Sequence, residues 1–397
     1  MSAPASEERS GASVGSRPEE PVSRSAALSV EIAAIEDVAG GGVRAAAAAN
    51  GAPAQVLDRV AIHGGVQVAR LATVTSGDRR VAAALAVNRP LAAYAKVVEV
   101  WVEDTADRAA AVEALVEAFA DETFAVGAVA LKWQVPEDDD ELAEILLGLG
   151  LSELRAPLND GLPATGSLGE EEPRPPTVRG FVRWRIEPRF PEPPYWRQTT
   201  GFTCGPVSLL VGLELRGRPL SFSREEELRL WREATSGQGC DPTGLAAVAG
   251  AYAPGVTLVM TDLDPDLRDR SRPAEVREVR RFFQDRFKST ARERGVRLRQ
   301  RDFTIEDVRE LVCGGATVLL LIDVFSQRGR HIPHWVTVFA VHDGVFIVQD
   351  SSTEWRAGET WVDLHLHAVP IATLDQQAWV GDPGYRAMLV LDDQSQR

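Results

Sequence analysis

The stretch that most constrains the fold of this chain runs from Tyr195 to Pro206, because it places a cysteine at the start of an apolar helical run. Gln198 lies six residues before Cys204, which is followed by Gly205, Pro206 and apolar residues up to Leu215. Proline is tolerated in the first turn of a helix, since its missing N–H would have no intrahelical partner there. We therefore expect a helix at residues 205–215 with Cys204 at its N-terminus.

A cysteine in this position has the chemistry of a nucleophile. The helix dipole and the free N–H groups at a helix N-terminus favour a thiolate over a thiol. The amide of Gln198 could join the Cys204 N–H as an oxyanion hole. Because a lone cysteine is more often a small buried hydrophobe, the interpretation depends on a base and on a group that orients the base.

Both partners are found near the C-terminal end of the sequence. His334 begins an alternating segment at residues 335–341, and a turn at residues 342–344 leads into a second apolar segment that ends at Asp350. A strand, a tight turn and a strand form a hairpin, which would bring Asp350 beside His334 to accept its ring N–H. The sequence thus predicts Cys204 as nucleophile, His334 as base, Asp350 as its orienting group and Gln198 as an oxyanion donor.

Composition narrows the classes of function. The formal net charge of −15 argues against general nucleic-acid binding. Cys204, Cys240 and Cys313 are an odd, sparse set that indicates reduced thiols in a cytoplasm rather than disulfides. We expect Cys240 to be structural near the cleft and Cys313 to belong to the core.

No metal, cofactor or membrane partner is expected. The sequence has no Cys-x-x-Cys pair, and His331 lies three residues before His334 without an evident third ligand. The longest apolar run, at residues 316–325, is interrupted by Asp323 and is too short to cross a membrane. The polar N-terminus lacks the apolar core of a signal peptide. We therefore expect a cytoplasmic protein.

The order of predicted elements indicates an α+β chain of two domains. We expect a disordered tail at residues 1–27, an α/β domain at 28–158, a Pro/Gly/Glu-rich linker and connecting strand at 159–189, and a second domain at 190–397. The strand near residues 180–186 could complete the first domain or lead into the second. Strands are predicted at 29–35, 66–73, 81–87, 97–102, 125–135, 317–324, 335–341, 345–349 and 387–391, and helices at 107–119, 141–149, 205–215, 224–234, 243–253, 274–294 and 304–312.

The element order of residues 28–158 resembles the GNAT acyltransferase fold. In that fold a glycine-rich turn between the central strand and its helix cradles the pyrophosphate of acyl-CoA. The corresponding turn here, Val102 to Arg108, has no glycine and carries Glu103, Asp104 and Asp107. We therefore expect a degenerate GNAT-like domain that folds but does not bind acetyl-CoA.

Three motifs of the second domain resemble the double-glycine leader peptidases of bacteriocin export, and more closely the stand-alone, peptidase-like branch that is sometimes fused behind a GNAT domain. They are Gln198…Cys204-Gly205-Pro206, Pro333-His334-Trp335-Val336 and Gln349-Asp350-Ser351. The resemblance implies a papain-like cysteine peptidase that hydrolyses a peptide bond in a peptide or leader-type substrate through an acyl-enzyme thioester. Two departures are the serine after Asp350, where the family usually has proline, and the lack of attached transporter segments.

Two other functions remain open at this point. An acyl or amide transferase would use the same thioester and resolve it with an amine instead of water. A non-catalytic peptide-binding module would retain the same residues as a vestigial triad.

Overall fold

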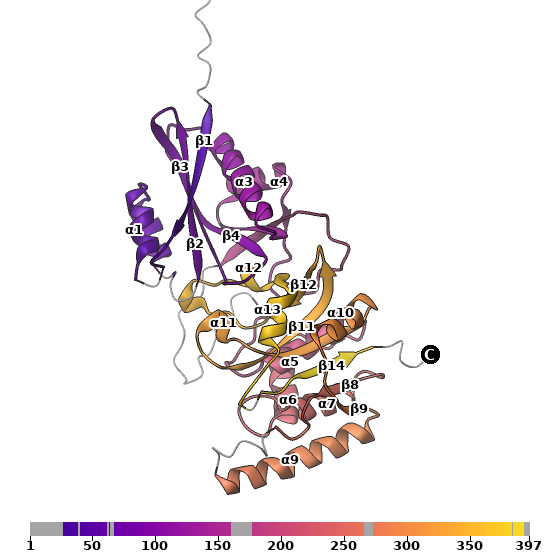
Figure 1. Ribbon diagram of the computed structural model, residues 1–397. Helices are drawn as coiled ribbons and strands as arrows, with labels where there is room; N and C mark the ends of the chain where they lie inside the picture. Colours follow the sequence, from indigo (N-terminus) through magenta and orange to yellow (C-terminus); the bar gives the residue numbers. More distant parts are fainter. Residues whose placement is uncertain are drawn as a thin grey trace, which may run out of the picture.

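Figure 1 shows the computed structural model, which describes residues 27–38, 40–61, 63, 67–159, 177–265, 273–382 and 384–392. The tail expected at residues 1–27, apart from Ala27, lies outside the described residues, as does the proline- and glycine-rich run at residues 160–176.

The first domain is built on a mixed seven-stranded sheet with the order β1-β2-β3-β4-β5-β7-β6. Its neighbouring strands are antiparallel except β4 and β5, which run parallel and are joined by helix α3. Successive residues of a strand point to opposite faces, so Ala82, Ala84 and Ala86 pack under α3 and α4, while Ala83, Leu85 and Val87 pack under α1 and α2. The elements are β1 Leu28–Ile35, α1 Gly42–Ala49, α2 Ala54–Val60, β2 Val68–Ser76, β3 Arg79–Asn88, β4 Tyr94–Val102, α3 Arg108–Ala125, β5 Ala130–Pro136, α4 Asp140–Gly148, β6 Ser152–Glu153 and β7 Val178–Trp184.

The strand expected in the connecting segment is β7. It pairs with β5 and β6, so it completes the first sheet rather than leading into the second. The α/β character predicted for this domain is confirmed by the sheet and its two helical layers (Figure 1).

The second domain has its own seven-stranded sheet, with the order β13-β12-β11-β10-β14-β8-β9. Helices α5, α6 and α7 share a core with one face of this sheet, α10 and α13 cover the other, and α9 lies at the end of the molecule away from the first domain (Figure 1). The elements are α5 Cys204–Leu215, α6 Arg224–Ala234, α7 Pro242–Ala249, β8 Thr257–Met260, α9 Ala274–Glu293, β9 Arg297–Gln300, α10 Ile305–Cys313, β10 Thr317–Asp323, α11 Phe325–Arg328, β11 Pro333–His342, β12 Val345–Gln349, η1 Trp355–Ala357, α12 Trp361–Leu364, β13 His367–Pro370, α13 Ile371–Gln377 and β14 Ala387–Leu391.

A single apolar cluster joins the two domains. Tyr94 and Val182 of the first domain pack with Trp361 and Leu364 of the second in this cluster. The backbone adds to it, because the N–H of Ala93 donates to the carbonyl of Ala368 over 2.9 Å. The domain contact is therefore a buried core rather than a wet surface between two mobile bodies.

Buried cations of the first domain complete this contact. The Lys132 ammonium donates to the carbonyls of Val362 at 2.8 Å and His365 at 2.7 Å, at the C-terminal end of α12. The Lys96 ammonium forms an ion pair with Asp363, and both side chains are 1% exposed. Since the last carbonyls of a helix have no intrahelical partners, these lysines satisfy polar groups that the domain contact would otherwise leave buried and unpaired.

Candidate active site

Helix α5 places Cys204 at the face of strand β11. The helix is tied to that strand in both directions, since Ser208 Oγ donates to the carbonyl of Trp335 and Thr337 Oγ1 donates to the carbonyl of Ser208, each over 3.0 Å. Gly205 permits the close approach, because an added Cβ would lie 3.2 Å from the Trp335 ring. As a result Cys204, which is 7% exposed, faces the beginning of the strand that carries His334.

The β11–β12 hairpin brings Asp350 to His334, as the sequence predicts. The hairpin turns at Asp343 and Gly344, which both have positive φ, and pairs Thr337 with Gln349. The Asp350 carboxylate lies directly after β12, and its Oδ1 is 2.7 Å from His334 Nε2. The other ring nitrogen is not used by Asp350, and the His334 side chain lies close enough to Cys204 for each group to shift the pKa of the other.

The electrostatics of these three groups favour an ion pair between the cysteine and the histidine. Burial alone would raise the pKa of the Cys204 thiol, but the charge and hydrogen bond of His334 and the backbone N–H groups near it bring that pKa below its ordinary value. Burial would lower the pKa of His334, yet Asp350 and Cys204 raise it to about 9. The pKa of Asp350 lies well below its ordinary range, because His334 and Arg89 outweigh the effect of burial. These shifts stabilise one protonation state of the site, in which Cys204 is a thiolate, His334 an imidazolium and Asp350 a carboxylate.

Gln198 is held against the loop that carries Asp350. Its Nε2 donates to the carbonyl of Thr200 over 2.8 Å, and its Oε1 accepts from Ser351 Oγ over 3.0 Å. The backbone N–H of Gln198 also donates to the carbonyl of Ser351. Ser351 therefore has a structural role, because its hydroxyl links the loop before Cys204 to the loop of Asp350.

Glu227 is a buried residue of the site that sequence reasoning missed. Its carboxylate accepts from Trp196 Nε1 and from the N–H of Thr199, both at 2.8 Å, and from the hydroxyl of Thr203. It thereby fixes the loop between Trp196 and the start of α5. The available signal was its spacing, since Glu227 shares the buried face of α6 with Leu230 and Ala234.

Arg89 is a second residue that was missed. It follows β3 in the first domain, and its Nη1 lies 2.7 Å from Asp350 Oδ2. No local pattern indicates this contact, because the two residues are 261 positions apart in the chain.

The remaining cysteines differ from Cys204. Burial, together with the nearby Cys204 and Asp241, raises the pKa of Cys240 well above its ordinary value. The expectation that Cys313 lies in the core is wrong: it ends α10 and is exposed. It is the last residue of that helix, and its side chain falls outside the buried set of Ile305, Val308 and Val312.

The structure gives His331 a carboxylate partner, with Nδ1 lying 2.9 Å from Asp323 Oδ2. Within the described residues, no group of three or more histidine, cysteine, aspartate or glutamate side chains is arranged to hold a metal ion. Across the same part of the chain, none of the helices combines the length and apolar character needed to cross a membrane.

Comparison with models of protein families identifies the family to which the second domain corresponds. Residues 193–392 match the model of the Peptidase_C39 like family. The chain belongs to the Peptidase_C39 like family. Membership confirms the peptidase-like fold that the three motifs of the second domain imply, and it takes in Cys204, His334 and Asp350 within the matched segment. A search of curated proteins found no match to the chain.

Among solved structures, this Peptidase_C39 like family member is similar to acetyltransferases over a minor part of its length. An acetyltransferase of Bacillus subtilis in complex with CoA is 9% identical, covers 40% of this chain and 100% of its own, and has a TM-score of 0.28. The ribosomal-protein-S18-alanine N-acetyltransferase of Escherichia coli is 16% identical, with coverages of 41% and 97% and a TM-score of 0.28.

Proposed function

We propose that the second domain is a cysteine peptidase that hydrolyses a peptide bond through Cys204, His334 and Asp350. The observation that carries the proposal is the convergence of the three side chains: Asp350 Oδ1 lies 2.7 Å from His334 Nε2, and His334 in turn lies close enough to Cys204, at the start of α5, to lower the pKa of its thiol. A nucleophile, a base and an orienting group in this order are the requirements of covalent acyl transfer.

In the proposed reaction the Cys204 thiolate attacks the carbonyl carbon of the scissile bond. The oxyanion that forms accepts hydrogen bonds from the backbone N–H at the start of α5 and from Gln198 Nε2. Gln198 Nε2 carries two hydrogens, and the carbonyl of Thr200 accepts one of them. The His334 imidazolium then gives its proton to the amine as the C–N bond breaks, which leaves a thioester. Water attacks the thioester and gives its proton to His334, and the acid product leaves as the thiolate is restored.

The low exposure of the nucleophile favours an extended substrate. A thiol that is 7% exposed is reached more easily by a narrow, unfolded segment than by the surface of a folded protein. We therefore propose a peptide or leader-type segment as substrate. We place the reaction in the cytoplasm, in keeping with three free cysteines.

Mapping of protein termini in cells tests this proposal for a substrate of any sequence. Cells carrying the wild-type chain, Cys204→Ala and the matched control Cys313→Ala are compared. We expect a set of new N-termini with the wild type and the control that is lost in Cys204→Ala. Products joined to an amine instead of a free carboxylate would assign the site to a transferase. Identical termini in all three strains would contradict peptidase activity and favour a binding module.

The reactivity of the thiol is a second, independent measurement. In the purified full chain, we expect iodoacetamide to modify Cys204 faster than Cys240 or Cys313, and at lower pH, because His334 lowers the pKa of Cys204 whereas burial raises that of Cys240. Equal rates at the three cysteines, all rising only near the ordinary thiol pKa, would contradict the proposed nucleophile.

A further inference from the structure

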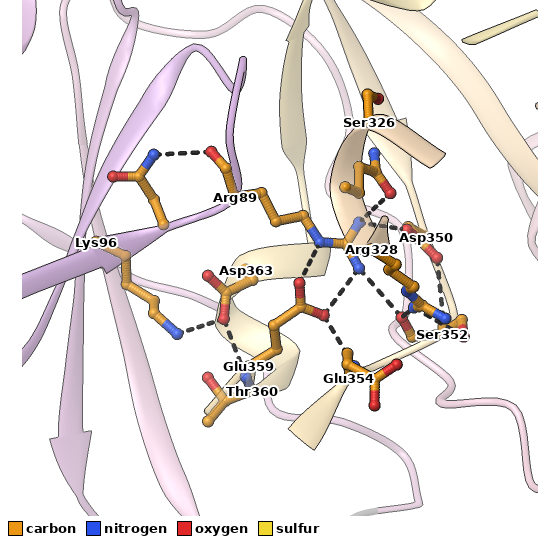
Figure 2. Close-up of polar contacts among 12 residues, drawn as sticks. Arg89, Lys96, Ser326, Arg328, Asp350, Ser352, Glu354, Glu359, Thr360 and Asp363 are labelled. Carbon is orange, nitrogen blue, oxygen red and sulfur yellow. Dashed lines mark hydrogen bonds and ion pairs between the residues drawn. The ribbon is translucent and has the colours of Figure 1, made fainter. Parts of the chain in front are cut away.

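A charged side chain of the first domain is buried beside the site of the second. Arg89 lies directly after β3 and is 1% exposed. Figure 2 shows its guanidinium between the carboxylates of Glu359 and Asp350, both of which belong to the second domain. Its Nε and Nη2 bind the two oxygens of Glu359 at 2.7 and 2.9 Å, and its Nη1 binds Asp350 Oδ2 at 2.7 Å.

This contact fixes the oxygen of Asp350 that His334 does not use. On Oδ1, Asp350 accepts from His334 Nε2 at 2.7 Å and from the N–H of Ser352 at 2.9 Å, and on Oδ2 it accepts from Arg89. A carboxylate held through both oxygens cannot rotate about its terminal bond without losing a charge-assisted hydrogen bond. The orientation that directs Oδ1 at His334 therefore depends on a residue from outside the peptidase-like domain.

The domain contact has other means of holding together. The apolar cluster around Trp361, the Lys96–Asp363 ion pair and the Lys132 contacts with carbonyls hold the domains together without an interaction with the Asp350 carboxylate. Burying an arginine has a large desolvation cost, and these other contacts hold the two domains together without an arginine beside the triad. Glu359, which is 3% exposed, holds the guanidinium through two hydrogen bonds and so directs the remaining Nη1 at Asp350.

We propose that Arg89 is a positioning residue for the triad, and that the first domain is by this contact part of the catalytic apparatus. The inference rests on the proposed function, because it assigns Asp350 as the group that orients His334. Through this contact the first domain acts on the geometry and charge of the reacting groups.

Several other groups surround the same carboxylate. Arg328 on α11 and His334 on β11 also lower the pKa of Asp350. Tyr195 and His367 have Asp350 as a charged neighbour. These groups stay in place in an Arg89 variant, so a change in the behaviour of the site reports the loss of Arg89 itself.

The experiment follows the alkylation of Cys204 against pH in the full chain, with peptide mass spectrometry as the readout. Arg89→Met leaves two buried carboxyls without their shared cation, which raises the pKa of Asp350 and weakens the imidazolium–thiolate pair as pH falls. We expect the acid limb of the Cys204 profile to move up by one pH unit or more, and hence a loss of about tenfold or more in rate below that limb. Arg89→Lys keeps the positive charge but not the bidentate donor geometry of the guanidinium, so it should shift the acid limb of the Cys204 profile less.

Lys96→Met is the matched control. It removes another buried cation of the same domain contact, and Figure 2 shows that Lys96 reaches Asp363 and not Asp350. We expect the pH profile of Cys204 in this variant to match that of the wild type. An equal shift in Lys96→Met would overturn the proposal, because it would assign the effect to general loosening of the contact. An unchanged profile in a folded Arg89→Met protein would overturn it as well.

Folding is monitored by thermal unfolding and by the alkylation rate of the exposed Cys313. If Arg89→Met does not fold, Arg89→Met with Glu359→Gln removes one buried charge of each sign and tests the same shift. The two proposals fail in different ways. A wild-type Cys204 that reacts like Cys313 contradicts the peptidase, whereas a reactive Cys204 with an unmoved profile in the Arg89 variant contradicts only the positioning role.

Discussion

Replacement of Glu227 by glutamine should destabilise the second domain and slow the reaction of Cys204. The Glu227 carboxylate is fully buried and accepts hydrogen bonds from Trp196, Thr199 and Thr203. Glutamine has nearly the same shape, but one of its two terminal atoms is a donor. Whichever way the amide is turned, it presents N–H to a group that is itself a donor.

The magnitude follows from these contacts. If the amide nitrogen takes the place of Oε2 it faces Trp196 Nε1–H, and if it takes the place of Oε1 it faces the N–H of Thr199. A buried donor without an acceptor costs about 1–3 kcal/mol, and the remaining bonds lose their charge-assisted part. Burying a neutral amide is cheaper than burying a carboxylate, which offsets some of the loss. We expect a net destabilisation of about 2 kcal/mol.

Thermal unfolding is the assay, with Glu225→Gln as the matched control on the exposed side of the same helix. At about 2–4 °C for each kcal/mol in a domain of this size, Tm should fall by about 4–8 °C in Glu227→Gln and stay within about 1 °C in the control. Because the affected loop carries Gln198 and leads into Cys204, the alkylation rate of Cys204 should fall as well. Equal Tm values for the two variants would refute the assigned role of the buried carboxylate.

Three further outcomes are expected. On a verified substrate, His334→Ala abolishes turnover, Asp350→Asn leaves a reduced rate, and Gln198→Ala costs on the order of a hundredfold; full activity of His334→Ala would contradict the mechanism. Acetyl-CoA does not bind the full chain in calorimetry, because Asp107 caps α3 with its own carboxylate; micromolar binding would disprove this. The pKa of Glu359 is lowered to about 2, mainly by Arg89 against the effect of burial. Its stabilising contribution of about 3 kcal/mol is therefore complete above its ordinary pKa of 4.5 and is lost as pH falls towards 2; an acid-unfolding curve that Glu359→Gln leaves unchanged would contradict it.

The parts of the fold that were predicted from sequence are those with a strong local period. Helix α6 and strands β12 and β14 have the predicted bounds, because an amphipathic period or a dense apolar run defines them. Strands β8 and β9 were missed, since four residues are too few for a period and the sequence of β9, Arg-Leu-Arg-Gln, has only one apolar residue. Their strand state depends on the parallel pairing between them and on β14.

The same division applies to the candidate site. Cys204, His334 and Asp350 were proposed from short motifs at a helix start, a strand start and a hairpin end, and the structure brings them together. Arg89 could not be proposed in this way, because nothing near it in the sequence distinguishes it from a solvent-exposed arginine. Its role depends on a tertiary contact between two domains, which no local pattern encodes.

The long sequence separation between Arg89 and Asp350 also has a consequence for the timing of biosynthesis. The two residues are 261 positions apart, so at 5–20 residues per second a ribosome needs about 10–50 s to reach the second after making the first. During this interval the first sheet can form up to β7, while the Arg89 guanidinium stays solvated because Asp350 and Glu359 have not yet been made. Under the proposed function, the nascent chain therefore has no oriented His334 and no activated Cys204 until Asp350 has been made and has met Arg89, and chains that stop short of this point cannot cleave their neighbours.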